Sequence, residues 1–214
     1  MINVLKYSLL FFLFSIVSTN VVANNAYEDA LKSFHNQKYS ETIIHLKNAL
    51  KENIDHIPSR ILLTETLIAQ GRGEMAETEI YDLQVSGVDF NQTIALLAQS
   101  LIMQNKYEQV LEVATSGYRG NHVESLILFA RGQAHLGLNQ LRQAEQAFSE
   151  TLVLQPDFQL AMLGIAQVAI NQSDLTKANS FVDKALESYE PLINAWIMKS
   201  SLYQLQGLKE KALL

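Results

Sequence analysis

The sequence predicts an all-α protein built from antiparallel helix pairs, because a 34-residue period, helical spacing of apolar residues and regularly placed turn residues occur together. With Ser125 as position 1 of a unit, three columns of mainly small or apolar residues recur every 34 residues. Position 8 holds Ala30, Thr64, Ala98, Gly132, Ala166 and Ser200; position 20 holds Thr42, Ala76, Val110, Ala144, Ala178 and Ala212; position 24 holds Leu46, Ile80, Ala114, Phe148 and Val182. A fixed period of this length is typical of stacked repeats.

Turn residues divide each unit into two helices of about 14 residues, A and B. Position 15 holds Gln37, Gly71, Asn105, Asn139, Ser173 and Gly207. Within the helices, apolar residues follow spacings of three and four, as in Leu160, Leu163 and Ala166. Units therefore start at 23, 57, 91, 125, 159 and 193 without any insertion. Small residues at positions 8 and 20 should let the paired helices approach closely.

This pattern resembles the tetratricopeptide repeat (TPR) over residues 23–214. The fourth unit carries Leu141, Ala144, Phe148 and Pro156 at the family's preferred positions, and the sixth carries Trp196, Ser200, Tyr203 and Gly207. The resemblance implies a right-handed superhelical solenoid of helix pairs with a concave binding surface. Three places depart from the family pattern: Asp29 and Arg60 at usually apolar positions, and Gly117-Tyr118 late in the third unit. We expect that B helix to end early, and the seam between units three and four to be a soft point or bend.

A narrower resemblance concerns the second unit and its surroundings. The segments Leu46–Leu50, Ser59–Leu63, Ala76–Ile80 and Ser86–Asp89 follow an order similar to TPR proteins of the exosortase (PEP-CTERM) system. That family accompanies exopolysaccharide and surface-protein sorting genes in bacteria, so the resemblance implies a role there. Its members commonly carry a lipid-anchor cysteine, which this chain does not have.

The first 23 residues are typical of a secretory signal peptide. Lys6 precedes an apolar run of 11 residues, Tyr7–Val17, and small residues stand before a cleavage point after Ala23. A membrane-spanning helix needs about 20 apolar residues, whereas the apolar region of a signal has roughly 7–15. The sequence predicts a signal over 1–23, a solenoid over 24–214, and a periplasmic or secreted protein that is not a lipoprotein. An uncleaved anchor and a buried helix are the alternatives.

Composition excludes several functional classes. The chain has 16 Lys and Arg against 22 Asp and Glu, a net charge of −6, which becomes −7 once Lys6 is removed with the signal. Such a balance disfavours a nucleic-acid partner. The absence of cysteine excludes disulfides, thiolate metal sites and a cysteine nucleophile. No phosphate-binding glycine loop or zinc-binding His pair is present, and the acidic residues are scattered. We therefore predict a non-enzymatic protein without cofactor or metal, in which His135 is a packed, hydrogen-bonded residue.

Helix A positions 5, 9 and 12 share one face and are predicted to line a groove that binds a peptide or a partner protein. Position 9 is mainly polar, and positions 5 and 12 are mainly apolar. An amide at position 9 can donate to and accept from a peptide bond. Lys at 5 and Asn at 9, which clamp a C-terminal carboxylate in some TPR modules, are both missing. The predicted groove residues are Tyr27, Ile61, Glu65, Gln99, Phe129, Gln133, Leu163, Gln167, Ile197 and Ser201.

Two structural interpretations compete with binding at these positions. The glutamines could bond one another between stacked helices or be merely solvated, and the apolar positions could pack against the next helix A. At the level of function, an exported interaction scaffold competes with the docking arm of a longer enzyme and with a solenoid that self-associates end to end. The sixth unit stops at position 22, within helix B, which predicts a fragment or a truncated reading frame.

Overall fold

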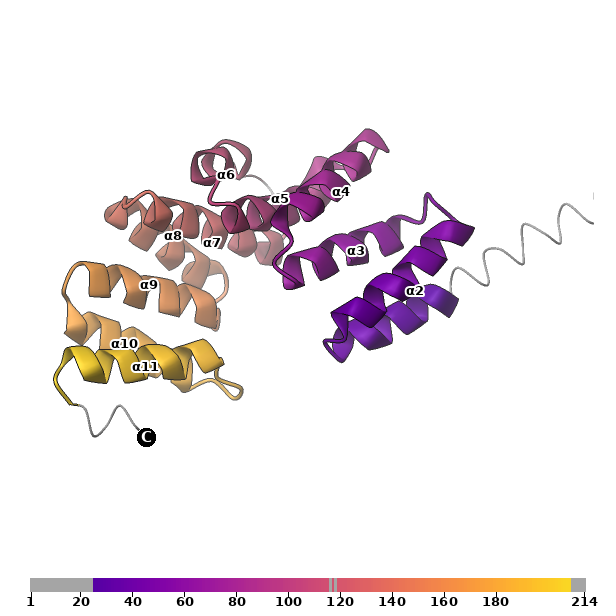
Figure 1. Ribbon diagram of the computed structural model, residues 1–214. Coiled ribbons are helices and arrows are strands. Elements are labelled where there is room, and N and C mark those ends of the chain that lie inside the picture. Colours follow the sequence, from indigo (N-terminus) through magenta and orange to yellow (C-terminus); the bar gives the residue numbers. More distant parts are fainter. Residues whose placement is uncertain (1–24, 116, 118, 209–214) are drawn as a thin grey trace, which may run out of the picture. The chain divides into compact units, whose positions relative to one another are not determined.

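The computed structural model describes residues 25–115, 117 and 119–208, and all regular secondary structure in these ranges is α-helical (Figure 1). The predicted all-α class is thereby confirmed. The chain forms two compact units, Met1–Ser100 and Leu101–Leu214, which are described separately. The predicted signal peptide lies outside the described residues. No described helix is long and apolar enough to cross a membrane.

Unit one contains two complete helix pairs and most of a fifth helix. A helix over residues 25–35 precedes α2 (Tyr39–Glu52); α3 (Ile57–Ala69) and α4 (Gly73–Val85) follow; and α5 (Phe90–Met103) crosses the boundary between the units. Helix α3 packs on both α2 and α4. Each helix therefore buries a face on its neighbours in chain order, as expected for repeats that cannot form a core alone.

Unit two holds the end of α5 and six further helices. These are α6 (Tyr107–Val113), α7 (Asn121–Gly137), α8 (Leu141–Leu154), α9 (Gln159–Asn171), α10 (Leu175–Leu186) and α11 (Ile193–Leu205). Consecutive helices from α6 to α11 pack on each other, and α7 also contacts α9. Within this unit the A helices form a layer in which α9 lies between α7 and α11 (Figure 1).

Every predicted position-15 turn has a left-handed residue. The φ angles are 56° at Gln37, 74° at Gly71, 57° at Asn105, 58° at Asn139, 62° at Ser173 and 76° at Gly207. At each turn two backbone hydrogen bonds close the A helix; the Ser173 N–H donates to Ile170 and the Asp174 N–H to Ala169. This is the Schellman arrangement, which satisfies carbonyl groups that a helix end otherwise leaves unpaired. The turn also reverses the chain, so that helix B returns alongside helix A.

The three repeat columns form the interior of the helix pairs. At position 8, Ala30, Thr64, Ala98 and Ala166 are fully buried, and every described member of columns 20 and 24 is at most 1 % exposed. The polar members are satisfied within their own helices: Thr64 Oγ1 donates to the Arg60 carbonyl at 2.9 Å, and Thr42 Oγ1 to the Lys38 carbonyl at 3.1 Å. A threonine can therefore replace alanine here without an unpaired hydroxyl.

The third B helix ends early, as Gly117 and Gly120 predict. Helix α6 has 7 residues, and the Arg131 guanidinium of α7 donates to the Ala114 carbonyl just beyond its end, at 2.9 Å. After α6, Arg119 pairs with Glu124 at 3.2 Å, and both side chains are almost buried. These contacts fasten the segment to the start of α7. The bend predicted at this seam stays a prediction; the boundary between the compact units falls instead within α5, at Ser100.

Arg60 adapts to a position that is usually apolar by forming ion pairs. Its guanidinium lies 3.3 Å from Glu79 and 3.8 Å from Asp82, both on α4, and donates to Ser86 Oγ at 3.1 Å. The pairing joins helices A and B of the second unit where other units use apolar contact. Asp29, the second departure, is exposed and lies 3.7 Å from Lys32 on its own helix.

The left-handed turns predict that Ser173→Gly stabilises the fold by about 0.5–1 kcal/mol, because a side chain in this conformation costs about 1 kcal/mol that glycine avoids. Urea unfolding monitored by circular dichroism measures the change. Gly71→Ala provides the opposite case: nothing lies within 4 Å of a Cβ there, so its expected loss of about 1 kcal/mol arises from the backbone alone. Equal stabilities for the two variants and the native chain would contradict this account of the turns.

Candidate binding groove

A pocket of about 510 Å³ lies along α7, α9 and α11 of unit two. Six of the predicted groove residues line it: Phe129, Gln133, Leu163, Gln167, Ile197 and Ser201. They come from positions 5 and 9 of three successive A helices, which the stacking of unit two brings side by side. The other lining residues are Leu136, Phe148, Leu160, Gly164, Ile170, Asn194, Met198 and Leu205.

The Phe148 ring contributes to the pocket from helix α8 and is held between two glycines. A Cβ on Gly132 of α7 would lie 2.5 Å from the ring, and a Cβ on Gly164 of α9 would lie 2.7 Å from it. The ring is 1 % exposed. Glycine at these two positions therefore makes room for an aromatic side chain between adjacent A helices.

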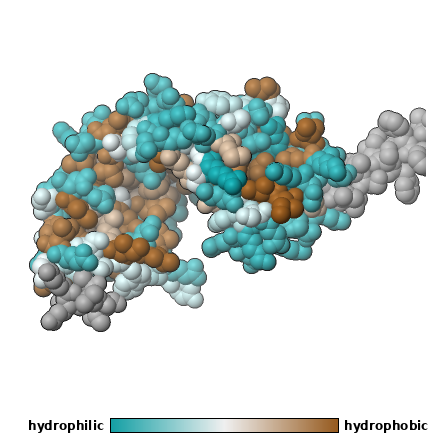
Figure 2. Space-filling view, viewed as in Figure 1, coloured by the Kyte–Doolittle hydropathy of each residue, from teal (hydrophilic) through white to brown (hydrophobic). Residues whose placement is uncertain are grey.

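The apolar side chains of the pocket range from buried to exposed. Leu163 is 6 % exposed and belongs to the core, whereas Leu160 is 40 % and Ile197 59 % exposed. Phe129 is half-buried, with its ring 5.7 Å from Phe148 and 5.2 Å from Phe158. On the face shown in Figure 2, hydrophobic side chains lie among polar ones over the C-terminal helices. Packing against the neighbouring helix thus accounts for Leu163, but not for Leu160 or Ile197.

Polar side chains follow the pocket at position 9 without bonding from helix to helix. The Gln167 amide donates to Asn171 Oδ1 at 3.0 Å, and Ser201 Oγ donates to the Ile197 carbonyl at 3.0 Å, both within one helix. Gln133 makes no hydrogen bond to another residue in the described part of the chain. The interpretation that these glutamines bond one another between stacked helices is therefore not supported in unit two. None of the residues lining this pocket carries a charge.

Unit one carries the other four predicted groove residues. Tyr27 lies on the helix over 25–35, Ile61 and Glu65 on α3, and Gln99 on α5; all four are half-buried. Tyr27 packs on the cluster of Ala30, Leu46 and Leu62, and its ring meets His56 edge-on at 5.3 Å. These positions face as the helical spacing predicts. Their role in binding stays a prediction.

Glu65 is the electrostatic feature of unit one. Burial raises the pKa of its carboxyl above the usual value of 4.5. Burial also raises the pKa of the Tyr27 phenol, and the charges of Glu65 and Glu28 add to that rise. The Tyr27 phenol therefore lies within the electric field of Glu65. An uncharged Glu65 and a neutral tyrosine are both favoured by this environment.

Comparison with known proteins identifies the fold. No family model matches the chain, and no curated protein sequence matches it. Among solved structures, a thermophilic TPR protein from Thermus thermophilus superposes with a TM-score of 0.71 at 17 % identity, covering 85 % of this chain and 99 % of that one. A tetratricopeptide repeat protein from Parabacteroides merdae superposes with a TM-score of 0.68 at 14 % identity, covering 89 % and 74 %. The chain has the tetratricopeptide repeat fold.

A third solved structure with this TPR fold has a known biological setting. PilW, described as a widely conserved type IV pilus biogenesis factor, superposes with a TM-score of 0.65 at 15 % identity, covering 89 % of this chain and 88 % of that one. The similarity concerns the fold alone. It neither confirms nor contradicts the sequence resemblance to exosortase-associated TPR proteins.

The pocket also contains residues that sequence reasoning did not place there. Phe148 stands on a B helix, and Gly164 occupies position 6, which the groove prediction left out. A signal was present: a phenylalanine at position 24 of one TPR unit is followed by a glycine at position 6 of the next. Read together, the pair indicates an aromatic ring between two A helices.

The histidines of the TPR units have structural surroundings. His135 is half-buried with Nδ1 2.7 Å from Gln140 Oε1, in agreement with the predicted hydrogen bond. His56 Nδ1 lies 2.7 Å from Ser59 Oγ at the start of α3. Among the described residues, no group of three or more His, Asp or Glu side chains is placed to hold a metal ion.

The raised pKa of Glu65 predicts a pH-dependent stability. Because the folded state favours the protonated carboxyl, the associated stability is complete below the usual pKa of 4.5 and is lost as the pH rises through the raised value. Glu65→Gln mimics the protonated form, so it should raise the thermal midpoint by a few degrees at pH 7 and hardly at all at pH 4. Scanning calorimetry at both values measures this. Glu28→Gln is the control, since Glu28 is exposed; an equal gain in both variants would refute the assignment to burial.

Proposed function

We propose that this chain is a non-enzymatic, exported interaction scaffold that binds a peptide segment of a partner protein in the pocket along α7, α9 and α11. The observation that carries the proposal is the register of the pocket. Positions 5 and 9 of three consecutive repeats line one cavity, with amides and a hydroxyl beside apolar side chains. A catalytic role finds no support in this uncharged lining.

The chemistry of the lining suits a peptide backbone. Gln133 and Gln167 each offer a donor and an acceptor, as a peptide bond does. The exposed parts of Leu160, Ile197 and Leu205 offer apolar surface to alternate side chains of the bound segment. Since the lining carries no charge, a terminal carboxylate has no cation to pair with there. An internal segment of the partner, extended or helical, fits this surface better than a chain terminus.

The cellular setting of the proposal rests on the sequence. The signal-like segment over 1–23 suggests export to the periplasm or beyond the cell, and the narrower resemblance suggests exopolysaccharide export or surface-protein sorting. A pilus biogenesis factor with the same fold, PilW, supports the broader idea that such scaffolds serve the assembly of surface structures. The acidic net charge of the chain argues for a protein partner and against nucleic acid.

Peptide selection on the purified chain tests the groove. Twelve-residue peptides selected from a random displayed library should bind the native chain and lose about tenfold in affinity to the double variant Gln133→Ala, Gln167→Ala, because two amide hydrogen-bonding sites are removed. The matched control is Gln143→Ala, Gln146→Ala, which removes two exposed glutamines of α8. Circular dichroism verifies that all chains stay helical. Equal loss in both double variants, or none in either, would place binding elsewhere.

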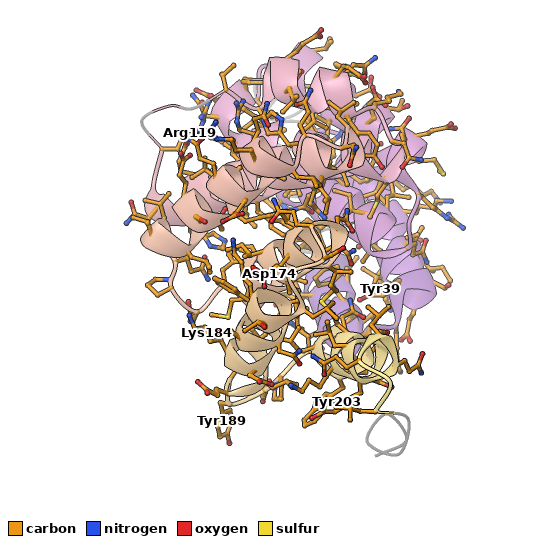
Figure 3. All side chains as sticks on the ribbon, turned by 90° about the vertical axis from the view of Figure 1, so that its left-hand side faces the viewer. Tyr39, Arg119, Asp174, Lys184, Tyr189 and Tyr203 are labelled. Carbon is orange, nitrogen blue, oxygen red and sulfur yellow. The ribbon has the colours of Figure 1, made fainter. Side chains whose placement is uncertain are left out.

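Self-association is a second candidate function, and one observation favours it. On α11, Ile193 is 76 % and Trp196 is 57 % exposed, and in the preceding loop Tyr189 is 98 % exposed and points away from the helices (Figure 3). Exposed apolar surface of this kind is common at interaction sites. Light scattering over a range of concentrations decides: a mass that rises with concentration and falls back in Trp196→Ser supports assembly, and a constant monomer mass excludes it.

A further inference from the structure

Unit one carries a carboxylate that the fold leaves without a counter-charge. Glu65 is half-buried at position 9 of α3, with Ile61 one turn before it and Ile68 on the same face after it. It forms no ion pair or hydrogen bond with another residue in the described ranges. Burial disfavours its charged form, so the fold bears a cost that a partner cation would remove.

Other half-buried carboxylates of the chain show how such a group is normally satisfied. Glu79 pairs with Arg60 at 3.3 Å, Glu124 with Arg119 at 3.2 Å, and Glu145 with Lys177 at 2.6 Å. Each of these pairs joins two neighbouring segments. Glu65 lies on a face that no cation of unit one reaches, because Arg60 turns to α4 and Lys32 lies beside Asp29.

The neighbours of Glu65 are aromatic and aliphatic. Tyr27 lies within its electric field, and Tyr27, Leu31 and Phe34 pack on the same cluster beneath the helix over 25–35. The titratable groups facing this region are Tyr27 and Glu28 from that helix and His56 from the start of α3, which contacts the Tyr27 ring. One carboxylate among aromatic and aliphatic surface suits a cation with a long apolar stem.

We propose that the face of unit one around Glu65 and Tyr27 is a subsite for an arginine side chain of a bound protein segment. A guanidinium is weakly hydrated, stacks on aromatic rings and pairs bidentately with a carboxylate, which suits a half-buried acid beside a tyrosine better than an ammonium does. The inference rests on the proposed function, peptide capture by helix A faces. It adds the residue class that unit one selects, whereas the uncharged pocket of unit two selects none by charge.

Two small probes that differ only in charge test the subsite. Nα-acetyl-arginine N-methylamide carries the guanidinium, and Nα-acetyl-citrulline N-methylamide is its neutral isostere. Titration of the full chain is followed by the ¹³C shift of the Glu65 carboxyl and the amide shifts of α3. We expect saturable binding of the arginine amide and about tenfold weaker binding of the citrulline amide, since a charge-assisted pair is lost.

Matched variants identify the carboxylate responsible. Glu65→Gln should weaken arginine amide binding about tenfold, while Glu28→Gln, an exposed carboxylate on the neighbouring helix, should leave it within about twofold. Lowering the pH to 3.5 should abolish the difference between the native chain and Glu65→Gln, because Glu65 is then protonated. Equal binding of the two probes, equal binding by Glu65→Gln, or tighter binding of a lysine amide would overturn the assignment.

The same titration separates this subsite from the proposed function. The double variant Gln133→Ala, Gln167→Ala changes unit two only, so it should bind the arginine amide like the native chain. Arginine amide binding without any selected peptide at the unit-two pocket would refute peptide capture there and keep the subsite. Peptide binding in unit two without arginine amide binding would refute the subsite alone.

Discussion

The close approach of paired helices is the constraint on which the rest of this structure depends. A small side chain at position 8 of helix A meets positions 20 and 24 of helix B, and apart from the half-buried Ser200 the described residues of these columns are buried. Backbones that approach this closely leave little room for variation. In the fourth unit the constraint is met by glycine, because the larger Phe148 occupies the space that a Cβ on Gly132 would need. Volume is thus exchanged across the helix pair.

The groove follows from the same packing. Positions 8 and 11 are used by the helix pair, so positions 5, 9 and 12 remain on the opposite part of helix A, where successive units place them in one row. Those positions are free to carry chemistry, and the two units use them differently. Unit two presents amides and a hydroxyl at position 9, with Gln133, Gln167 and Ser201, whereas unit one presents the carboxylate of Glu65. Identical backbones can therefore hold different surfaces.

Sequence reasoning located the features that depend on a single position. The turn column predicts left-handed residues at 34-residue intervals because chain reversal after a helix requires that conformation, and φ is positive at each of them. The early end of α6 follows from Gly117 and Gly120 in the same way. Features that depend on two distant side chains were not anticipated. The Phe148 ring between Gly132 and Gly164, the Arg60 pairs with α4 and the Arg131 contact beyond α6 all require knowledge of which helices meet.

The uninterrupted spacing of the left-handed turns makes the length of this protein change in steps. One inserted residue inside a helix rotates everything after it by about 100° around the axis, which would turn a buried column toward solvent. A whole block of 34 residues restores every column to its face. Lengthening or shortening of such a chain is therefore tolerated in multiples of its repeat, and each added block extends the row of position-9 side chains by one. Reach along a partner and chain length are then the same variable.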